Sequence, residues 1–175
     1  MKGKAYELLE NHKLVLDAFG FWPSFHDAEV CWLRLDRMKE GVGVHGGPAL
    51  EFELHFWETT GEVDEDGYFR LVNHNLVHFR FEDVRAVELL GFNHQNAIFE
   101  LKISAEPQNE EGVTPLKVVF ESCYGLGGEF KACRGRVMAV TPCNENGNDI
   151  GKTAAPRTPL PRRLVARPCG DPTEK

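Results

Sequence analysis

The stretch GFWPSFHDAEV, residues 20–30, lies between a helical pattern and the first strand-like pattern of the chain. Pro23 lacks an amide proton and restricts Trp22 to extended conformations, so a preceding helix is expected to end here. Trp22 and Phe25 are large apolar groups beside this chain reversal, and we expect them to close one end of a core. The stretch therefore separates a predicted helix from a predicted sheet.

His26 and Asp27 form the chemically suggestive pair in this stretch. A carboxylate beside an imidazole can fix the tautomer of the ring, as a general base requires. Sequence neighbours in an extended segment usually point apart, however, which favours a bracing role for Asp27 and a backbone hydrogen bond for His26. We predict a structural or recognition role for both, with a binding role left open and no catalytic residue assigned.

Before this turn, residues 5–19 place apolar groups at helical spacing and predict one amphipathic helix ending at Gly20. After it, the period changes to two. Strands are predicted at residues 30–36, 49–57, 68–72, 76–82, 99–105 and 116–120, and a last hairpin at 130–133 and 137–141, while 84–92 fits either a helix or a strand.

These patterns predict an α+β fold in which the N-terminal helix packs on an antiparallel, strongly twisted sheet of six to eight strands. The apolar positions of each element give the expected core: Leu8, Leu16, Phe52, Leu54, Phe79, Phe81, Phe99 and Leu101. We expect a single domain over residues 1–142. Residues 143–175 are rich in Pro and Gly and are expected to form a disordered tail, in which a PxxP spacing with nearby arginines leaves a polyproline ligand open.

The charge of the chain is uneven. The whole chain carries −7, and residues 143–175 hold six Lys/Arg against four acids, which leaves −9 on residues 1–142. An acidic body argues against nucleic acid as a ligand, because phosphate contacts need a basic face. The charge fits a basic protein partner, and it fits plain solubility equally well.

Five cysteines without a CxxC pair indicate neither a disulfide framework nor a closed zinc site. No apolar run reaches the length of a membrane span or of a secretory signal, so we expect a cytoplasmic protein without a membrane partner. No P-loop, GxSxG, HExxH or dinucleotide fingerprint occurs, and we predict no cofactor and no enzyme.

Carboxylates gather in one predicted loop, as Glu62, Asp64, Glu65 and Asp66. Part of this loop is similar to a calcium loop, but the later ligands of an EF-hand are missing, so a solvated hairpin tip available to a partner is favoured. Glu51, Glu53 and His55 alternate on one strand face, where a metal site is possible but a solvated sheet face is favoured. His74 and His78 have zinc-ligand spacing only on a helix, and their pattern is that of a strand, so no metal is predicted.

Three segments together carry a family resemblance: WPSFHDAEV (22–30), VDEDGY (63–68) and GFNHQN (91–96). They resemble a bacterial family of immunity proteins of polymorphic toxin systems, over roughly residues 18–141. The resemblance implies a cytoplasmic protein that binds and neutralises a cognate toxin by protein–protein contact, without catalysis. The motif residues implied in structure or recognition are Trp22, His26, Asp27, Glu29, Asn93, His94, Gln95 and Asn96.

The charge adds a surface to this expectation. We predict that Glu62, Asp64, Glu65 and Asp66 contact a basic toxin domain. The alternative is a small enzyme or ligand-binding domain built on His26, Asp27 and His94, which would require the two turns to meet in space.

Overall fold

The computed structural model describes residues 4–37, 47–110 and 112–150. It begins with a 3-10 helix η1 (Ala5–Leu8) and the α-helix α1 (Lys13–Phe19). Eight strands follow: β1 (Glu29–Asp36), β2 (Ala49–Val63), β3 (Phe69–Glu82), β4 (Arg85–Leu90), β5 (Ala97–Ala105), β6 (Leu116–Tyr124), β7 (Gly127–Ala132) and β8 (Arg134–Pro142).

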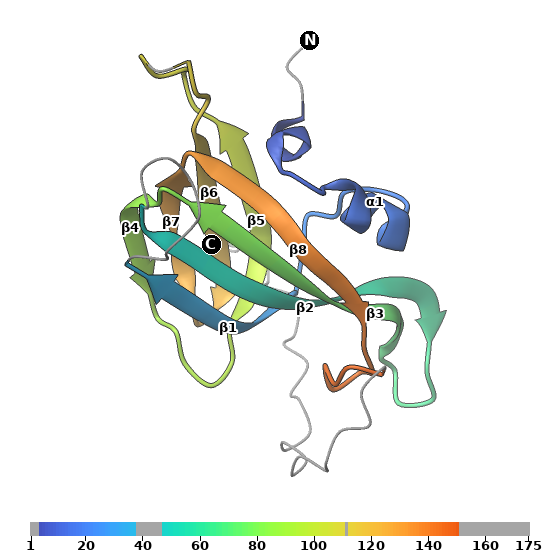
Figure 1. Cartoon of the computed structure of the whole chain (residues 1–175). Coiled ribbons are helices and arrows are strands. Elements are labelled where there is room, and N and C mark those ends of the chain that lie inside the picture. Colours follow the sequence, from blue (N-terminus) through green and yellow to red (C-terminus); the bar gives the residue numbers. More distant parts are fainter. Residues whose placement is uncertain (1–3, 38–46, 111, 151–175) are drawn as a thin grey trace, which may run out of the picture.

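The strands form one antiparallel sheet in the order β4-β7-β6-β5-β1-β2-β3-β8. Figure 1 shows its two halves as layers, with β1, β2, β3 and β8 in front of β5, β6 and β7. The ring of Phe52 on β2 lies 4.9 Å from Phe120 on β6, and that of Phe81 on β3 lies 5.1 Å from Phe130 on β7. These pairs join strands that are not neighbours in the sheet, so the sheet curls onto itself around an aromatic core.

The helix α1 closes one end of this core. Val15 and Phe19 of α1 are buried, and Phe19 meets Phe56 of β2 edge to face at 5.2 Å. Gly20 ends the helix in the left-handed conformation, with a φ of 76°, and its N–H donates to the carbonyl of Leu16. The prediction of an α+β fold with a helix on an antiparallel sheet of six to eight strands is confirmed, and the sheet has eight strands.

The prediction of one continuous helix over residues 5–19 is wrong. Asn11 has a φ of 59°, and Glu10 pairs with Arg136 as an isolated parallel bridge on the β8 edge. The N–H of Glu10 donates to the carbonyl of Gly135, and the N–H of Val137 donates to the carbonyl of Glu10. These edge hydrogen bonds hold the chain extended between η1 and α1, against the helical pattern of the side chains.

Two residues of the expected core are exposed. Leu8 lies at the end of η1, where the broken helix turns it outward, and Phe99 is on the outer side of β5 because a register shift lies between Ile98 and Glu100. Leu16 is half-buried. The other five expected core residues are buried: Phe52, Leu54, Phe79, Phe81 and Leu101.

Two strand predictions are corrected, and one open alternative is resolved. The segments 68–72 and 76–82 form the single strand β3, and the segment 84–92, left open between a helix and a strand, contains the strand β4. The segments 130–133 and 137–141 do not pair as a hairpin, because β7 pairs with β6 and β4 whereas β8 pairs with β3. The chain crosses at Cys133 from one half of the curled sheet to the other.

The described chain continues past the boundary predicted at residue 142. Residues 143–150 form a turn in which Cys143 is buried and forms an isolated antiparallel β-bridge with Asp149. Burial, together with Glu53 and Asp149, raises the pKa of the Cys143 thiol to about 11. Residues 151–175, most of the predicted tail, lie outside the described residues, so the domain boundary stays a prediction. Neither described helix has the length and apolar character needed to cross a membrane.

Candidate partner-binding surface

The turn at residues 22–28 is built from two left-handed residues. Phe25 and Asp27 have φ values of 60° and 62°, a conformation in which aspartate is tolerated and a bulky residue is rare. Phe25 is nevertheless fully buried, in edge contact with Phe56 and Phe79. Trp22 stacks on Tyr6 of η1 with the ring centroids 4.5 Å apart. The turn thus inserts one ring into the core and binds the N-terminal segment with another.

The pair His26 and Asp27 lies at the surface. Nδ1 of His26 is 3.0 Å from the carboxylate of Asp27, and the two side chains are 52% and 56% exposed. The imidazole also contacts the ring of Phe99 at 4.8 Å. An exposed pair of this kind contributes little to stability. It also lacks the enclosed surroundings that are typical of catalytic acids and bases.

The second motif, residues 91–96, is organised by the buried side chain of Asn96. Its Oδ1 accepts hydrogen bonds from the N–H groups of Asn93 and Leu126, at 2.8 and 3.2 Å. Its Nδ2 donates to the carbonyl of Asn93 at 2.8 Å. Asn93 folds the turn further, because its Oδ1 accepts from the N–H of Gln95 and its Nδ2 donates to the carbonyl of Gly91. This asparagine arrangement fixes the loop before β5.

The two motifs meet. The carboxylate of Glu29 accepts a hydrogen bond from the N–H of Asn96 at 2.5 Å, and the N–H of Val30 donates to the carbonyl of Asn96. Around this point β1 and β5 share only one registered pair, Glu29 with Ala97. The motif residues therefore hold the narrowest seam of the sheet, where its two halves join.

The histidines of the two turns do not form a joint site among the described residues. His26 contacts Phe99, whereas the nearest ring to His94 is that of Tyr124, at 6.3 Å, and no hydrogen bond or ring contact joins the two histidines. In the described parts of the chain, no group of three or more His, Cys, Asp or Glu side chains is placed to hold a metal ion. The described structure therefore does not bring His26 and His94 into contact.

The acidic loop is the tip of a projecting hairpin. Pairing of β2 with β1 ends at His55 of β2, which lies opposite Glu29. Pairing of β3 with β8 ends at Asn75 of β3, which lies opposite Pro142. Beyond these points β2 and β3 pair only with each other. We call residues 58–72 the arm; it stands at the right-hand edge of the molecule in Figure 1.

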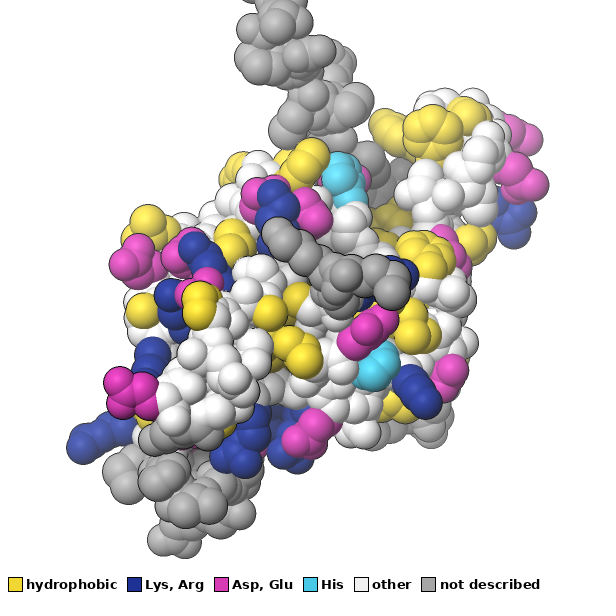
Figure 2. Space-filling view, turned by 90° about the horizontal axis from the view of Figure 1, so that it is seen from above, with side chains coloured by type: hydrophobic (Ala, Val, Ile, Leu, Met, Phe, Trp, Pro, Cys, Tyr) yellow, Lys and Arg dark blue, Asp and Glu magenta, His cyan; other side chains and the backbone are white. Residues whose placement is uncertain are grey.

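The predicted partner-binding residues differ in what they do on the arm. Asp64 shapes the tip, because its Oδ1 accepts from the N–H groups of Asp66 and Tyr68, at 3.0 and 2.8 Å. Glu62 forms an exposed ion pair with Arg70 at 3.1 Å. Glu65 and Asp66 are exposed at the turn. In Figure 2, acidic side chains gather at the outer end of the projection at upper right, beside hydrophobic ones.

The base of the arm is fixed to the body. Nδ2 of Asn73 donates to the carbonyl of Ala18 at the end of α1 and to the carboxylate of Glu58, at 3.0 and 2.8 Å. Phe56, just below the arm, packs against Phe19 and Phe25. The arm therefore leaves the body in a defined direction.

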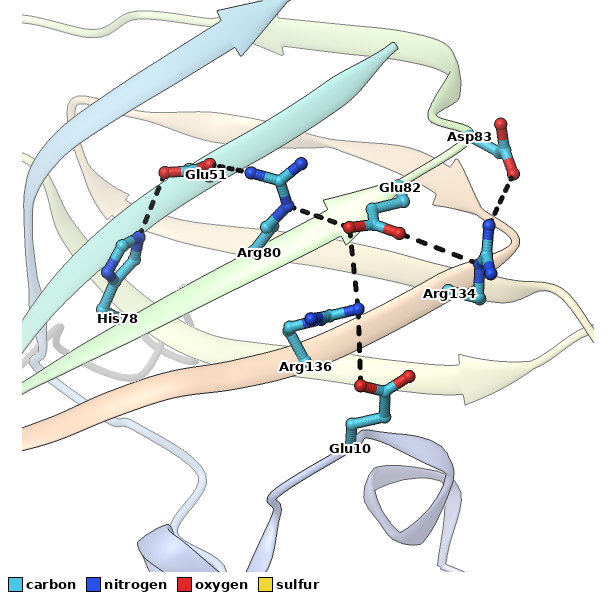
Figure 3. A network of polar contacts seen from close by, with 8 residues as sticks. All are labelled: Glu10, Glu51, His78, Arg80, Glu82, Asp83, Arg134 and Arg136. Carbon is cyan, nitrogen blue, oxygen red and sulfur yellow. Dashed lines mark hydrogen bonds and ion pairs between the residues drawn. The ribbon is translucent and has the colours of Figure 1, made fainter. Parts of the chain in front are cut away.

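Sequence reasoning missed a charge network on the outer face of β2, β3 and β8 (Figure 3). Glu51, Arg80 and Arg136 are direct cross-strand neighbours, and the side chain of Arg80 is only 6% exposed. Its guanidinium donates to Glu51 at 2.6 Å and to Glu82 at 3.0 Å. The face that alternation alone predicts to be solvated is therefore closely packed with paired charges.

The network also reaches the N-terminal segment. Arg136 lies 3.7 Å from Glu82 and 3.4 Å from Glu10, so it links the sheet to the residue between η1 and α1. His78 contacts Glu51 at 3.3 Å, and Arg134 contacts Glu82 and Asp83. Charged or histidine side chains at alternate positions of 51–53, 78–82 and 134–136 were the available signal. Which of them pair depends on the strand register, which the sequence does not give.

The sequence model of a family described as Immunity protein 50 matches residues 11–143. The matched segment includes α1, all eight strands, both motif turns and the arm. No curated protein and no solved structure matches the chain significantly.

Proposed function

The chain belongs to the Immunity protein 50 family, and we propose that it acts in the cytoplasm by binding a cognate bacterial toxin domain and neutralising it through protein–protein contact. No catalytic step is part of this proposal. The proposal rests on family membership for the class of function and on the arm for the place of contact.

The observation that carries the place of contact is the acidic arm. Residues 58–72 hold five carboxylates, from Glu58, Glu62, Asp64, Glu65 and Asp66, and one arginine, Arg70, for a net charge of −4. These charges stand on a ribbon that projects beyond the sheet and is exposed on both faces over residues 61–70. A projecting charged element meets a partner before the rest of the surface does.

The charge also indicates the chemistry of the partner. Toxin domains that act on nucleic acid need basic surfaces to contact phosphates. An acidic arm complements such a surface, and it would both steer the encounter and cover the groups that the toxin uses on its substrate. We therefore propose a basic toxin domain as the partner.

The motif residues have a different part in this proposal. Glu29 and Asn96 are occupied by hydrogen bonds within the seam, and Trp22 by its stacking on Tyr6. We assign them to holding the scaffold that presents the arm. His26, Asp27, His94 and Gln95 lie nearer the surface, and we assign them no chemistry.

The test is co-expression with the cognate toxin domain, which is to be sought first in the gene immediately upstream. The parent chain is expected to restore growth and to co-purify with the toxin in a complex that survives gel filtration. A growth defect that persists, with the chain folded and present at the toxin's level, would refute the proposed function.

A further inference from the structure

We propose that an apolar face of the arm, formed by Val63, Phe69 and Leu71, is the anchor that holds the toxin once the acids have attracted it. The partner chemistry it fits is an apolar patch bordered by lysine or arginine side chains. This inference rests on the proposed function, and it assigns a separate role to residues that the sequence analysis did not single out.

The strand register places the three side chains together. Val63 is paired with Phe69 across the ribbon, and Leu71 follows Phe69 by two positions on the regular strand β3, opposite Thr59, while the register of β2 shifts between Thr59 and Val63. Cross-strand partners and alternate residues point to the same face of a β-ribbon. The arm therefore has one face of apolar groups.

The other face of the ribbon is polar. Arg70, between Phe69 and Leu71, forms its ion pair with Glu62, and Oγ1 of Thr60 donates to the carbonyl of Arg70 at 3.0 Å. The two faces thus separate apolar contact from charge, while the tip residues Glu65 and Asp66 stand at the end of both.

The apolar face is open to solvent. Val63 is 57% exposed, Phe69 60% and Leu71 38%. A two-stranded ribbon without a third strand is itself only marginally stable in water, so apolar groups gathered there add little to folding. Clustered exposed apolar groups rimmed by charges are the usual composition of a protein-binding patch.

The arm is also prepared for binding. Its tip is shaped by the two hydrogen bonds to Asp64, and its base is held through Asn73 to the end of α1. Because these contacts exist before the partner arrives, little order has to be gained on binding. Central aromatic and aliphatic side chains on such an element carry most of the energy that resists dissociation.

The experiment compares two variants by stopped-flow and surface-binding kinetics with the upstream toxin domain. Val63→Thr combined with Phe69→Thr removes apolar surface and places at both positions a β-branched side chain that suits a strand. We expect its dissociation rate to rise by about tenfold or more, with the association rate and its salt dependence close to those of the parent. A Leu90→Ala variant, at a site 78% exposed on the far edge strand, is the matched control and should keep the parent rates.

Three outcomes decide the inference. Parent dissociation rates in a folded Val63→Thr, Phe69→Thr variant would overturn it. A parent chain that sediments as a dimer, and becomes a monomer in this variant, would assign the apolar face to a second copy and overturn it as well. If the parent chain itself fails to bind the toxin, the proposed function fails, which is a different result from binding without a role for the apolar face. If the double variant misfolds, the dissociation rate is measured with Phe69→Ala alone, which changes the ribbon less and is expected to raise that rate as well.

Discussion

The carboxylate of Glu29 accepts a hydrogen bond from the backbone N–H of Asn96, 67 residues further along the chain, at 2.5 Å. The first residue belongs to the motif at 22–30 and the second to the motif at 91–96. The bond lies where β1 and β5 share a single registered pair, so it joins the two halves of the curled sheet. The two motifs are one structural unit.

Asn96→Ala is therefore expected to destabilise the fold strongly. It removes the side-chain acceptor of the Asn93 and Leu126 N–H groups and leaves buried polar groups without partners. The expected loss is about 2–4 kcal/mol in the free energy of unfolding, from roughly 1–3 kcal/mol per orphaned group. Urea unfolding measures it. Gln95→Ala is the control, because Gln95 contributes its backbone N–H to the turn and the substitution keeps it. An equal loss in both variants would speak against the role of Asn96.

Asp27 offers a test of backbone strain in the first motif. The partner of its carboxylate is the exposed His26, so the pair itself is worth little, and the reason for Asp27 lies in its φ of 62°. Asp27→Ala is expected to lower stability by about 1 kcal/mol, because alanine is strained at positive φ, and Asp27→Gly should recover most of that loss. Thermal melts of both variants measure the difference. A glycine variant no more stable than the alanine variant would show that backbone strain is not the reason for Asp27.

Arg80 is expected to be the most sensitive member of the charge network. Arg80→Ala leaves Glu51 and Glu82 close together without the cation between them, and the cost of breaking such a buried pair is about 3–5 kcal/mol. Arg70→Ala breaks an exposed pair with Glu62 and should cost less than about 1 kcal/mol. Chemical denaturation compares the two arginines directly. Losses of similar size would mean that the network on the outer face is not effectively buried.

The end of the folded body can be located by truncation. A chain ending at Ile150 keeps the turn with the buried Cys143 and its bridge to Asp149, and we expect it to melt within a few degrees of the full chain. A chain ending at Pro142 loses this turn, including Gly147, where an added Cβ would lie 3.4 Å from Nδ1 of His55, and we expect a clearly lower melting temperature. Equal melting of the two truncated chains would place the boundary at residue 142, as the composition alone suggests.

Much of the fold could be predicted because alternation along a strand reports burial directly. Leu50, Phe52 and Leu54 alternate with polar residues, and all three are buried on β2. The pattern failed where another contact overrides it. The edge hydrogen bonds of Glu10 break the helical stripe of residues 5–19, and the register shift beside Phe99 turns that ring outward.

Contacts between distant segments could not be predicted from spacing. The residues of the two motifs were identifiable, but not that Glu29 and Asn96 would meet. Likewise, the adjacency of β7 and β8 in sequence indicates a hairpin, whereas their pairing depends on how the whole sheet curls. The acidic tip was predicted from composition, and the apolar face beside it became visible only with the register of Val63 on Phe69.

The central claim is that the arm captures a basic toxin domain. It is tested by the association rate of the upstream toxin domain with a variant carrying Glu62→Gln, Asp64→Asn, Glu65→Gln and Asp66→Asn. Asparagine at 64 retains the side-chain oxygen that accepts the N–H groups of Asp66 and Tyr68, so the turn is expected to keep its shape. The measurement is made by stopped flow over a range of salt concentrations.

The account predicts that, at low salt, the variant associates about tenfold or more slowly than the parent and that its rate depends less on salt, because exposed charges act on the encounter and are screened within roughly 10 Å at 0.1 M. An association rate and a salt dependence equal to those of the parent chain would contradict it.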